Sequence, residues 1–320
     1  MTCATVDVAG GPMGGAARFR DEFYAYLERT GRQDVEIIGA QRRLGAAWLL
    51  CREVSRSVRG RRVALNNVGF FSPGGERWTL LGNALHFLTD AEIARLHPSH
   101  RTVTRYQATM VRLAARQSDV LIAPCTAMAE RVLRVLPCVK DRLVVRMHPA
   151  SAELTPKLSR EPVILCPVLF SFYKPMVERL TELLAALNHD FDPSIRVLVT
   201  AGRTEVPGIL ADNPRIKLVG RLDYASLRKI SARSSATYYP THLESFGYPL
   251  AEARVSGQPV IALDTPQNRE IAGDALCGFT PGDVSSLQRA AALALTKDVA
   301  PDPAPFDPDA YFNWLLGSPR

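Results

Sequence analysis

Two carboxylates, Glu244 and Glu252, stand on either side of a glycine turn in the stretch ESFGYPLAE. A carboxylate accepts hydrogen bonds from vicinal hydroxyl groups such as those of a ribose, and it can also stabilise positive charge that develops at a sugar carbon. The spacing therefore favours a site for a hydroxyl-rich ligand. It is equally compatible with a strand–turn–helix unit whose two glutamates face solvent, because glutamate is favoured near helix N-termini.

The turn between these carboxylates predicts an anion site made of backbone groups. The residues YYPT before it end a strand, and Pro249 suits the first turn of the following helix, where a missing N–H costs nothing. The backbone N–H groups of Phe246, Gly247 and Tyr248 would then lie at a helix N-terminus, which attracts a diphosphate. Phosphate held by the backbone and hydroxyls held by carboxylates together fit a nucleotide sugar.

The longer stretch ESFGYPLAEARVSGQPVIALDTPQNREIAGDAL resembles the signature of retaining GT-B glycosyltransferases of family 4, the glycosyl transferases group 1. The resemblance implies that Glu252 binds the ribose hydroxyls of a nucleoside-diphosphate sugar and that Glu244 contacts the donor sugar in the catalytic centre. It also implies that the backbone of residues 246–248 cradles the sugar and the phosphate. Glu270 and Gly273 complete the signature beside the site, with a purely structural role as an equal alternative.

Two further segments resemble donor-binding parts of the same family. In VILCPVLFSFYKP, Lys174 matches the lysine that reaches the donor diphosphate, and a compact ammonium group suits phosphate; a solvated loop lysine is the alternative. Many members carry an arginine where this chain has Leu169, and Arg203 is a candidate substitute. KLVGRLDYASL is similar to the segment that lines the nucleotide base, so Arg221 and Leu222 are donor-binding candidates, although Arg221 also fits ordinary loop charge.

The N-terminal part of the chain carries a glycine-rich turn after its first predicted strand. GGPMGGAARF lacks the G-x-G-x-x-G pattern, and no acidic residue ends the second strand, which disfavours a dinucleotide-binding fold. In the resembling family the corresponding loop faces the donor, so Gly14 and Gly15 become donor-binding candidates. Arg18 is a further candidate, with an ordinary surface position on the helix as the alternative.

The segment LLGNALHFLTDAE holds the candidate polar groups of the reaction centre. Many members of the resembling family have a His-Asp pair here, close to the reacting sugar. In this chain the aligned position is Asn83, and His86 follows three residues later. We therefore treat Asn83 and His86 as candidate catalytic residues, with a histidine at the edge of the core as the alternative.

Short β-branched runs alternate with helical periods in two blocks of the chain. They are separated by the proline-containing residues 148–162, which we interpret as a linker. The alternation predicts two α/β domains with parallel sheets, and the resemblance implies GT-B, in which two Rossmann-like domains face each other across a cleft. We assign 1–155 to an N-terminal acceptor-side domain, completed by a returning helix at 308–320, and 156–307 to the donor-binding domain.

Composition points to an ordinary water-soluble protein. The 320 residues are 47% hydrophobic with a net charge of +7, and arginine far exceeds lysine, a bias typical of GC-rich bacterial genomes. The basic run at 56–62 indicates a solvated helix end rather than a nucleic-acid patch. Six cysteines without metal spacing predict reduced, mostly buried thiols in a cytoplasmic protein. No signal peptide, apolar membrane span or amphipathic basic helix is evident.

We expect neither a metal nor another cofactor. The stretches Asp190–Asp192 and Asp307–Asp309 have the D-x-D spacing of metal-dependent glycosyltransferases. Neither follows a predicted strand, so we interpret them as helix-end and N-cap residues. His97 and His100 lack a third ligand nearby.

The sequence thus predicts a metal-independent, retaining glycosyltransferase of the hexosyltransferase type, which moves a sugar from a nucleoside diphosphate to an acceptor hydroxyl. The resemblance implies front-face attack, with Lys174 and a helix N-terminus stabilising the leaving diphosphate. The acceptor could be a small molecule, a glycan or a lipid-linked group, and peripheral membrane contact is open. Two alternatives remain: a pseudo-glycosyltransferase that couples a nucleotide-activated cyclitol to an amine, and a non-catalytic nucleotide-sugar-binding partner subunit.

Overall fold

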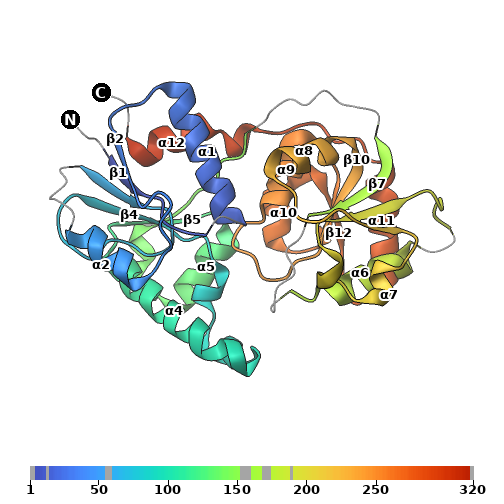
Figure 1. Cartoon of the computed structure of the whole chain (residues 1–320), viewed down its shortest axis with the longest axis horizontal. Coiled ribbons are helices and arrows are strands. Elements are labelled where there is room, and N and C mark those ends of the chain that lie inside the picture. The colour runs from blue at the N-terminus through green and yellow to red at the C-terminus, as the bar shows by residue number, and fades with distance from the viewer. Residues whose placement is uncertain are drawn as a thin grey trace. The chain divides into compact units, whose positions relative to one another are not determined.

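The computed structural model describes residues 4–11, 14–54, 60–151, 160–167, 174–187 and 190–317 (Figure 1). They divide into two compact units. The first comprises Met1–Ser151, Glu244–Phe246 and Pro305–Arg320, and the second comprises Ala152–Leu243 and Gly247–Ala304. Each unit is therefore assembled from segments that are distant in the sequence.

The first unit is built on a six-stranded parallel sheet. In spatial order its strands are β2 (Val35–Ile38), β1 (Ala4–Asp7), β3 (Arg61–Ala64), β4 (Glu76–Leu80), β5 (Val120–Ala123) and β6 (Leu143–Val145). One face is covered by α1 (Gly15–Thr30) and α12 (Pro308–Leu316), and the other by α2 (Ala46–Val54), α4 (Pro98–Gln117) and α5 (Thr126–Val135), as Figure 1 shows. Shorter elements are η1 (Ala84–Phe87), α3 (Asp90–Ala94) and η2 (Pro137–Arg142).

The C-terminal helix α12 completes the core of this first unit. Its Tyr311 and Phe312 pack edge-on against Phe19 of α1, with ring centroids 5.6 Å apart in both pairs. Tyr26 of α1 donates its hydroxyl hydrogen to Asn313 Oδ1 at 2.7 Å. Buried aromatic side chains with one satisfied polar group thus fix α12 on α1.

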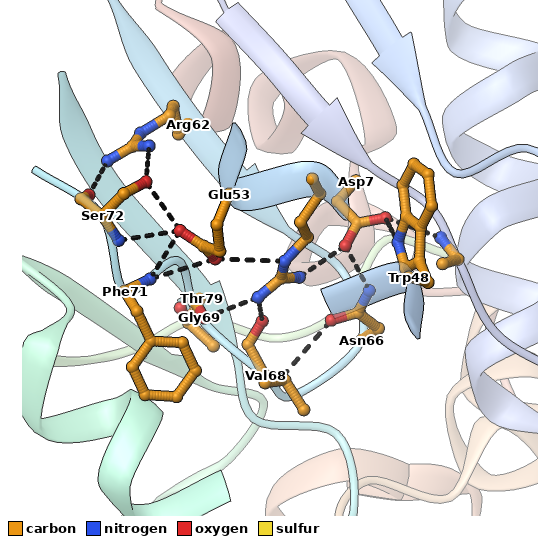
Figure 2. A network of polar contacts seen from close by, with 12 residues as sticks. Asp7, Trp48, Glu53, Arg62, Asn66, Val68, Gly69, Phe71, Ser72 and Thr79 are labelled. Atoms are coloured by element: carbon orange, nitrogen blue, oxygen red, sulfur yellow. Dashed lines mark hydrogen bonds and ion pairs between the residues drawn. The ribbon is translucent and has the colours of Figure 1, made fainter. Parts of the chain in front are cut away.

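A buried polar network ties the carboxyl end of β1 to α2 and to the loop after β3 (Figure 2). Asp7 accepts hydrogen bonds from Trp48 Nε1 at 3.1 Å, from Asn66 Nδ2 at 2.8 Å and from the backbone N–H of Ala9 at 3.0 Å. Arg52 Nη1 lies 2.5 Å from Asp7 Oδ2, and neither side chain is exposed. Because every partner is internal, this network supports the fold and leaves Asp7 no capacity for a ligand.

The second unit contains another six-stranded parallel sheet. Its spatial order is β12 (Leu276–Phe279), β11 (Val260–Leu263), β10 (Ser234–Tyr239), β7 (Glu161–Cys166), β8 (Arg196–Val199) and β9 (Ile216–Leu218). The helices are α6 (Met176–Ala186), α7 (Gly208–Ala211), α8 (Tyr224–Arg233), α9 (Tyr248–Ser256), α10 (Pro266–Ala272) and α11 (Val284–Thr296), with the short turns η3 (Arg203–Glu205) and η4 (Gly273–Ala275). The chain then passes through η5 (Ala304–Phe306) into α12.

Both sheets confirm the predicted α/β class with parallel, Rossmann-like units, but several local predictions were wrong. Residues 148–151, predicted as linker, are packed: His148 and Ala150 are buried, and Ala150 N–H donates to the Phe306 carbonyl at 3.0 Å. Of the rest of that segment, 152–159 lie outside the described residues, and Glu161 begins β7. Strand β12 was missed because its residues Leu276–Phe279 include a glycine and no β-branched side chain.

The basic run and the cysteines also differ from expectation. Arg61 and Arg62 belong to β3 rather than to a helix end; Arg61 stacks over the Trp78 ring at 3.8 Å, and Arg62 is buried. Residues 55–59 of that run lie outside the described part of the chain. Cys125, Cys166 and Cys277 are buried as predicted, whereas Cys51 and Cys138 are exposed. Helix α5 is preceded by Cys125 as its N-cap residue.

Candidate functional site

The carboxyl ends of the strands in the first unit are linked by polar contacts through the loops that follow them. Asn67, after β3, adopts the left-handed backbone region with φ 69°, and its Oδ1 accepts a hydrogen bond from Gly82 N–H at 2.6 Å. Gly82 follows β4, and a Cβ atom there would lie 3.9 Å from Nε2 of His148, which follows β6. Loops at this edge of a parallel sheet are the usual location of ligand sites.

The candidate catalytic residues Asn83 and His86 lie together on η1. Asn83 is the N-cap, where its Oδ1 accepts from Leu85 N–H at 3.0 Å, and its Nδ2 lies 3.4 Å from His86 Nε2. His86 is buried, and Arg112 Nε of α4 donates to its carbonyl oxygen at 2.9 Å. Burial, assisted by the nearby Arg112 charge, lowers the pKa of His86 to about 4. At neutral pH His86 is therefore an uncharged hydrogen-bonding group and a poor proton donor.

The segment Glu244–Phe246 is held by the loops of the first unit. Ser245 Oγ donates to the Gly82 carbonyl at 2.8 Å, and the Cys125 thiol donates to the Ser245 carbonyl at 3.2 Å. The ring of Phe246 packs against His148, with centroids 5.1 Å apart. Glu244 is half-buried. Its position follows from the contacts that hold the hydroxyl and the carbonyl group of the next residue, Ser245.

The glycine turn before α1 has an open backbone. Gly14 is the N-cap of α1 with φ 78°, Gly15 begins the helix, and both are exposed. Arg18, in contrast, is buried and forms an ion pair with Glu22 at 2.5 Å, so the surface alternative for this residue was wrong. Glu22 also accepts a hydrogen bond from Ser151 N–H at 2.7 Å, which gives the Arg18–Glu22 pair a structural connection.

In the second unit the order of the strands creates a switch point between β7 and β10. The chain runs from β7 to β8 and β9 on one side, then returns to β10 on the other. In open α/β sheets, ligands generally bind at the carboxyl ends of the strands where the connections diverge in this way. Lys174 precedes α6 on the β7 side, and its Nζ lies 5.9 Å from the ring centroid of Tyr239, the last residue of β10. Leu169 lies outside the described residues.

The turn after β10 has the geometry that the sequence predicted. Gly247 is the N-cap of α9 with φ 92°, and a Cβ atom there would lie 3.1 Å from Leu250 and 3.2 Å from Tyr239, so a side chain would be strained. Pro249 occupies the first turn as expected. Tyr248 is buried, and Glu252 lies one turn into the helix, half-buried.

A cationic group that the sequence did not reveal lies beside this turn. Arg179 of α6 forms an ion pair with Glu182 at 2.5 Å, and its Nη2 lies 3.0 Å from His242 Nε2. Burial and the Arg179 charge lower the pKa of His242, which favours the neutral imidazole as the acceptor. The Tyr238 hydroxyl donates to the Arg179 carbonyl at 2.8 Å. Helix α6 is thereby fastened to β10 at the switch point.

The remaining donor-side candidates make local contacts. Arg221 donates from Nη1 to the Thr200 carbonyl at 3.2 Å and pairs with Glu205, whereas Leu222 is half-buried just before α8. Hydrogen bonds from Gly202 N–H and from Arg221 lower the pKa of Glu205. Arg203 forms an exposed ion pair with Asp212 at 2.6 Å.

Glu270 and Gly273, at the end of the signature, make contacts that support the fold. A Cβ atom on Gly273, which has φ 53°, would lie 3.0 Å from the Arg254 guanidinium. Arg254 Nη1 donates to the Glu270 carbonyl at 3.2 Å, and the same guanidinium pairs with Asp302 at 2.6 Å. These contacts explain a glycine at position 273 without any ligand.

The D-x-D stretches serve turns and caps. Asp307 caps α12 by accepting from Asp309 N–H at 2.8 Å, as predicted, whereas Asp192 accepts from Ser194 N–H at 2.7 Å in a turn. Within the described ranges, no group of three or more His, Cys, Asp or Glu side chains is arranged to hold a metal ion. None of the helices in the same ranges combines the length and the apolar character needed to traverse a bilayer.

Several residues of the candidate site were missed in the sequence. Asn67, Ser245 and His148 position neighbouring loops, and Arg179 lies beside the turn after β10. The only usable signal was position: Asn67 and His148 follow predicted strands, as the candidates Asn83 and Lys174 do. Ser245 lies in the turn after a predicted strand and Arg179 lies in α6, but their contacts join segments far apart in the chain, so their roles could not be read from the pattern.

Comparison with known proteins gives a family match for part of the chain. Residues 210–304 match the family model described as glycosyl transferases group 1. Among curated protein sequences, none matches the chain with significance.

Solved structures resemble the chain over nearly its whole length. Sucrose-phosphate synthase from Thermosynechococcus elongatus is 15% identical with a TM-score of 0.63, covering 98% of this chain and 96% of that one. A UDP-forming α,α-trehalose-phosphate synthase from Burkholderia xenovorans is 11% identical with a TM-score of 0.61, covering 99% and 98%. The HepE protein of Anabaena, solved in complex with UDP, is 15% identical with a TM-score of 0.61, covering 98% of both chains. The fold is therefore that of GT-B proteins.

Proposed function

We propose that this GT-B protein, with its group 1 glycosyl transferase segment, moves a sugar from a nucleoside diphosphate to an acceptor hydroxyl with retention at the anomeric carbon. The donor would be a hexose derivative, and the reaction would need no metal ion or other cofactor. The observation that carries the proposal is the switch point of the second sheet. Lys174 flanks it after β7, and the glycine N-cap of α9 flanks it after β10.

Each group at this switch point suits one part of a nucleotide sugar. The N-terminus of α9 offers backbone N–H groups at Gly247 and Tyr248 to a phosphate, and the Lys174 ammonium adds a point charge. Glu252, on the same helix, accepts hydrogen bonds from ribose hydroxyls. Arg221 and Leu222 remain candidates for the base, although the contacts of Arg221 with Thr200 and Glu205 also account for it structurally.

The reaction itself needs a leaving diphosphate whose growing charge is stabilised. We assign that role to Lys174 and the α9 N-terminus, and the donor sugar to Glu244. Asn83 and His86 supply uncharged polar groups on the acceptor side, because the lowered pKa of His86 keeps its imidazole neutral. With no second carboxylate assigned as a covalent nucleophile, front-face attack with proton transfer to the leaving phosphate is the mechanism we favour.

Calorimetric titration of UDP, GDP and dTDP without added metal tests the proposal. UDP is the first choice because the similar HepE structure was solved with it. We expect one nucleotide to bind, and Glu252→Ala and Lys174→Ala to weaken it by about tenfold or more, since each removes a charged hydrogen-bonding partner. Glu178→Ala and Lys217→Ala, which change exposed residues of α6 and β9, are the matched controls.

The expected pattern separates the donor site from general charge effects. Equal losses in the test and control variants would contradict a specific site at the switch point. Binding of none of the three nucleotides would overturn the proposal. A nucleotide that binds would then be tested as its sugar derivative, with release of the free nucleotide as the readout of transfer.

A further inference from the structure

Helix α4 (Pro98–Gln117) has an inner face that belongs to the core and an outer face that does not. Its buried residues include Thr104, Ala108, Val111 and Ala115. They recur three or four residues apart, as expected for one side of a helix. In Figure 1, α4 is the long helix along the lower edge of the first unit.

The outer face carries an apolar stripe. Val103, Tyr106 and Leu113 are 57%, 66% and 44% exposed, more large exposed apolar side chains than on any other described helix or strand. Spacings of three and seven residues place them on one side of the helix. Because the helix begins at Pro98, Val103 lies within it and belongs to the stripe. The sequence predicted no amphipathic basic helix, and that prediction was wrong, because α4 has this character.

A row of arginines runs beside the apolar stripe. Arg101, Arg105, Arg112 and Arg116 are spaced by four, seven and four residues, and the twenty residues of the helix include no aspartate or glutamate. Arg105 and Arg116 are exposed and form no ion pair among the described residues. Of the acidic side chains on neighbouring elements, Glu92 pairs with Arg131 and Asp119 with Arg77, whereas Asp90 of α3 acts on Arg112.

We propose that the outer face of α4 docks on the surface of a bilayer rich in anionic phospholipid. The apolar stripe would enter the boundary between headgroups and acyl chains, and Arg105 and Arg116 would contact lipid phosphates. A nucleic-acid surface would use the arginines but leave Val103, Tyr106 and Leu113 in water. The combination of the exposed Arg105 and Arg116 with exposed aliphatic and aromatic side chains therefore favours a lipid surface.

The helix that carries the docking face also contacts η1, which holds the candidate acceptor-side residues Asn83 and His86. Arg112, in the arginine row, donates from Nε to the carbonyl of His86 at 2.9 Å and also bonds the carbonyl of Leu88. The same helix that would touch lipid thus fixes η1 in place. This arrangement suits an acceptor presented at a membrane, but the docking proposal itself rests only on the outer face of α4.

Co-sedimentation of the full chain with vesicles tests the proposal without any nucleotide or sugar. We expect binding to vesicles of phosphatidylglycerol and phosphatidylcholine, and little to phosphatidylcholine alone. The double variant Arg105→Gln/Arg116→Gln should bind about twenty-fivefold more weakly, at about fivefold per arginine. Tyr106→Ser/Leu113→Ser should also lose most binding, because it removes the apolar contact.

Matched controls lie in the second unit. Ile209→Ser removes an 84% exposed apolar side chain, and Arg289→Gln removes an exposed arginine of α11; both should bind as the parent does. Circular dichroism of every variant shows whether it is folded. Equal binding to both vesicle types would overturn the proposal. Unchanged vesicle binding by the Tyr106→Ser/Leu113→Ser variant would also overturn it. So would competition by single-stranded DNA that abolishes vesicle binding equally in the parent and in that variant. Those last results would mean a general polyanion site.

Discussion

The hydroxyl group of Ser245 donates a hydrogen bond to the carbonyl oxygen of Gly82 at 2.8 Å, across 163 positions of sequence. Together with the thiol of Cys125, which donates to the Ser245 carbonyl at 3.2 Å, it determines where the backbone beside Glu244 lies. The candidate catalytic carboxylate is therefore positioned by residues of the first unit, although it precedes a helix of the second.

Removing this hydroxyl should affect turnover more than nucleotide binding. Ser245→Ala leaves Phe246 packed against His148 but loses one hydrogen bond, which is typically worth about 1 kcal/mol. If the proposed function holds, we expect a roughly fivefold slower transfer at saturating donor, with unchanged calorimetric affinity for the nucleotide. Ser256→Ala is the control, because among the described residues that hydroxyl bonds only to backbone carbonyls of α9. A loss of nucleotide affinity with normal turnover would contradict the assigned role.

The buried pair of Arg52 and Asp7 makes a second prediction. Arg52→Met leaves Asp7 as an uncompensated buried charge, and we expect the free energy of unfolding of the first unit to fall by about 3–5 kcal/mol. Adding Asp7→Asn should recover part of the loss, because it removes that charge. All three tryptophans belong to the first unit, so tryptophan fluorescence in urea follows this unit alone.

Arg29→Met is the matched control for that experiment. Its ion pair with Asp309 is about half exposed, and such pairs contribute about 0–1 kcal/mol. If the Arg52 and Arg29 variants lost the same stability, the buried network would have no special importance.

The stability of the first unit should depend on pH through two buried histidines. Burial lowers the pKa of His148 to about 3, and burial with the Arg112 charge lowers that of His86 to about 4, from an ordinary value of 6.5. Between pH 6.5 and about 4 the unfolded chain binds protons that the folded chain does not. Stability is therefore fully present above pH 6.5 and is lost as the pH falls, by about 4 kcal/mol at pH 5 for the pair.

Urea unfolding at several pH values checks this dependence. The double variant His86→Gln/His148→Gln should show a much flatter change between pH 7 and pH 5 than the parent chain. His97→Gln, an exposed control, should leave the slope as it is. An identical slope in the double variant would assign the effect to other groups.

Removing the hydroxyl group from each of two tyrosines at the α1–α12 contact should change the stability of the first unit in opposite directions. The Tyr311 hydroxyl is buried with no hydrogen-bond partner among the described residues, so Tyr311→Phe should stabilise the first unit by up to about 1 kcal/mol. The Tyr26 hydroxyl bonds Asn313, so Tyr26→Phe should destabilise it by about 1 kcal/mol. Thermal unfolding of both variants measures the two effects, and shifts of the same sign would contradict the different roles assigned to the two hydroxyls.

Much of the fold was readable because its signals are local. The β-branched runs, the proline at the start of α9 and the glycine after it each act within a few residues, and the structure reproduces them. Helix α11 is readable because Asp283 caps an apolar helical period. Strand β12 has no β-branched residue, and helix α3 is too short to show a period.

The candidate site was readable only in part. Gly247, Asn83 and Lys174 follow strands, and residues at such positions can be found by pattern. The partners that hold them could not be found in this way: Gly82 with Ser245, and Arg179 with His242, meet only through folding. Burial explains the remaining errors, since nothing in the local sequence distinguishes a buried Arg18 or His148 from an exposed one.

The return of α12 to α1 has a consequence for the order in which the chain can fold during synthesis. Phe19 and Phe23 leave the ribosome early, but their aromatic neighbour Phe312 is made only after the second unit is complete. Until then the apolar side of α1 lacks its cover, and domains otherwise tend to fold in the order of translation. The second unit should therefore reach its native state first. The first unit should remain incompletely folded, and accessible to chaperones, until α12 has been synthesised.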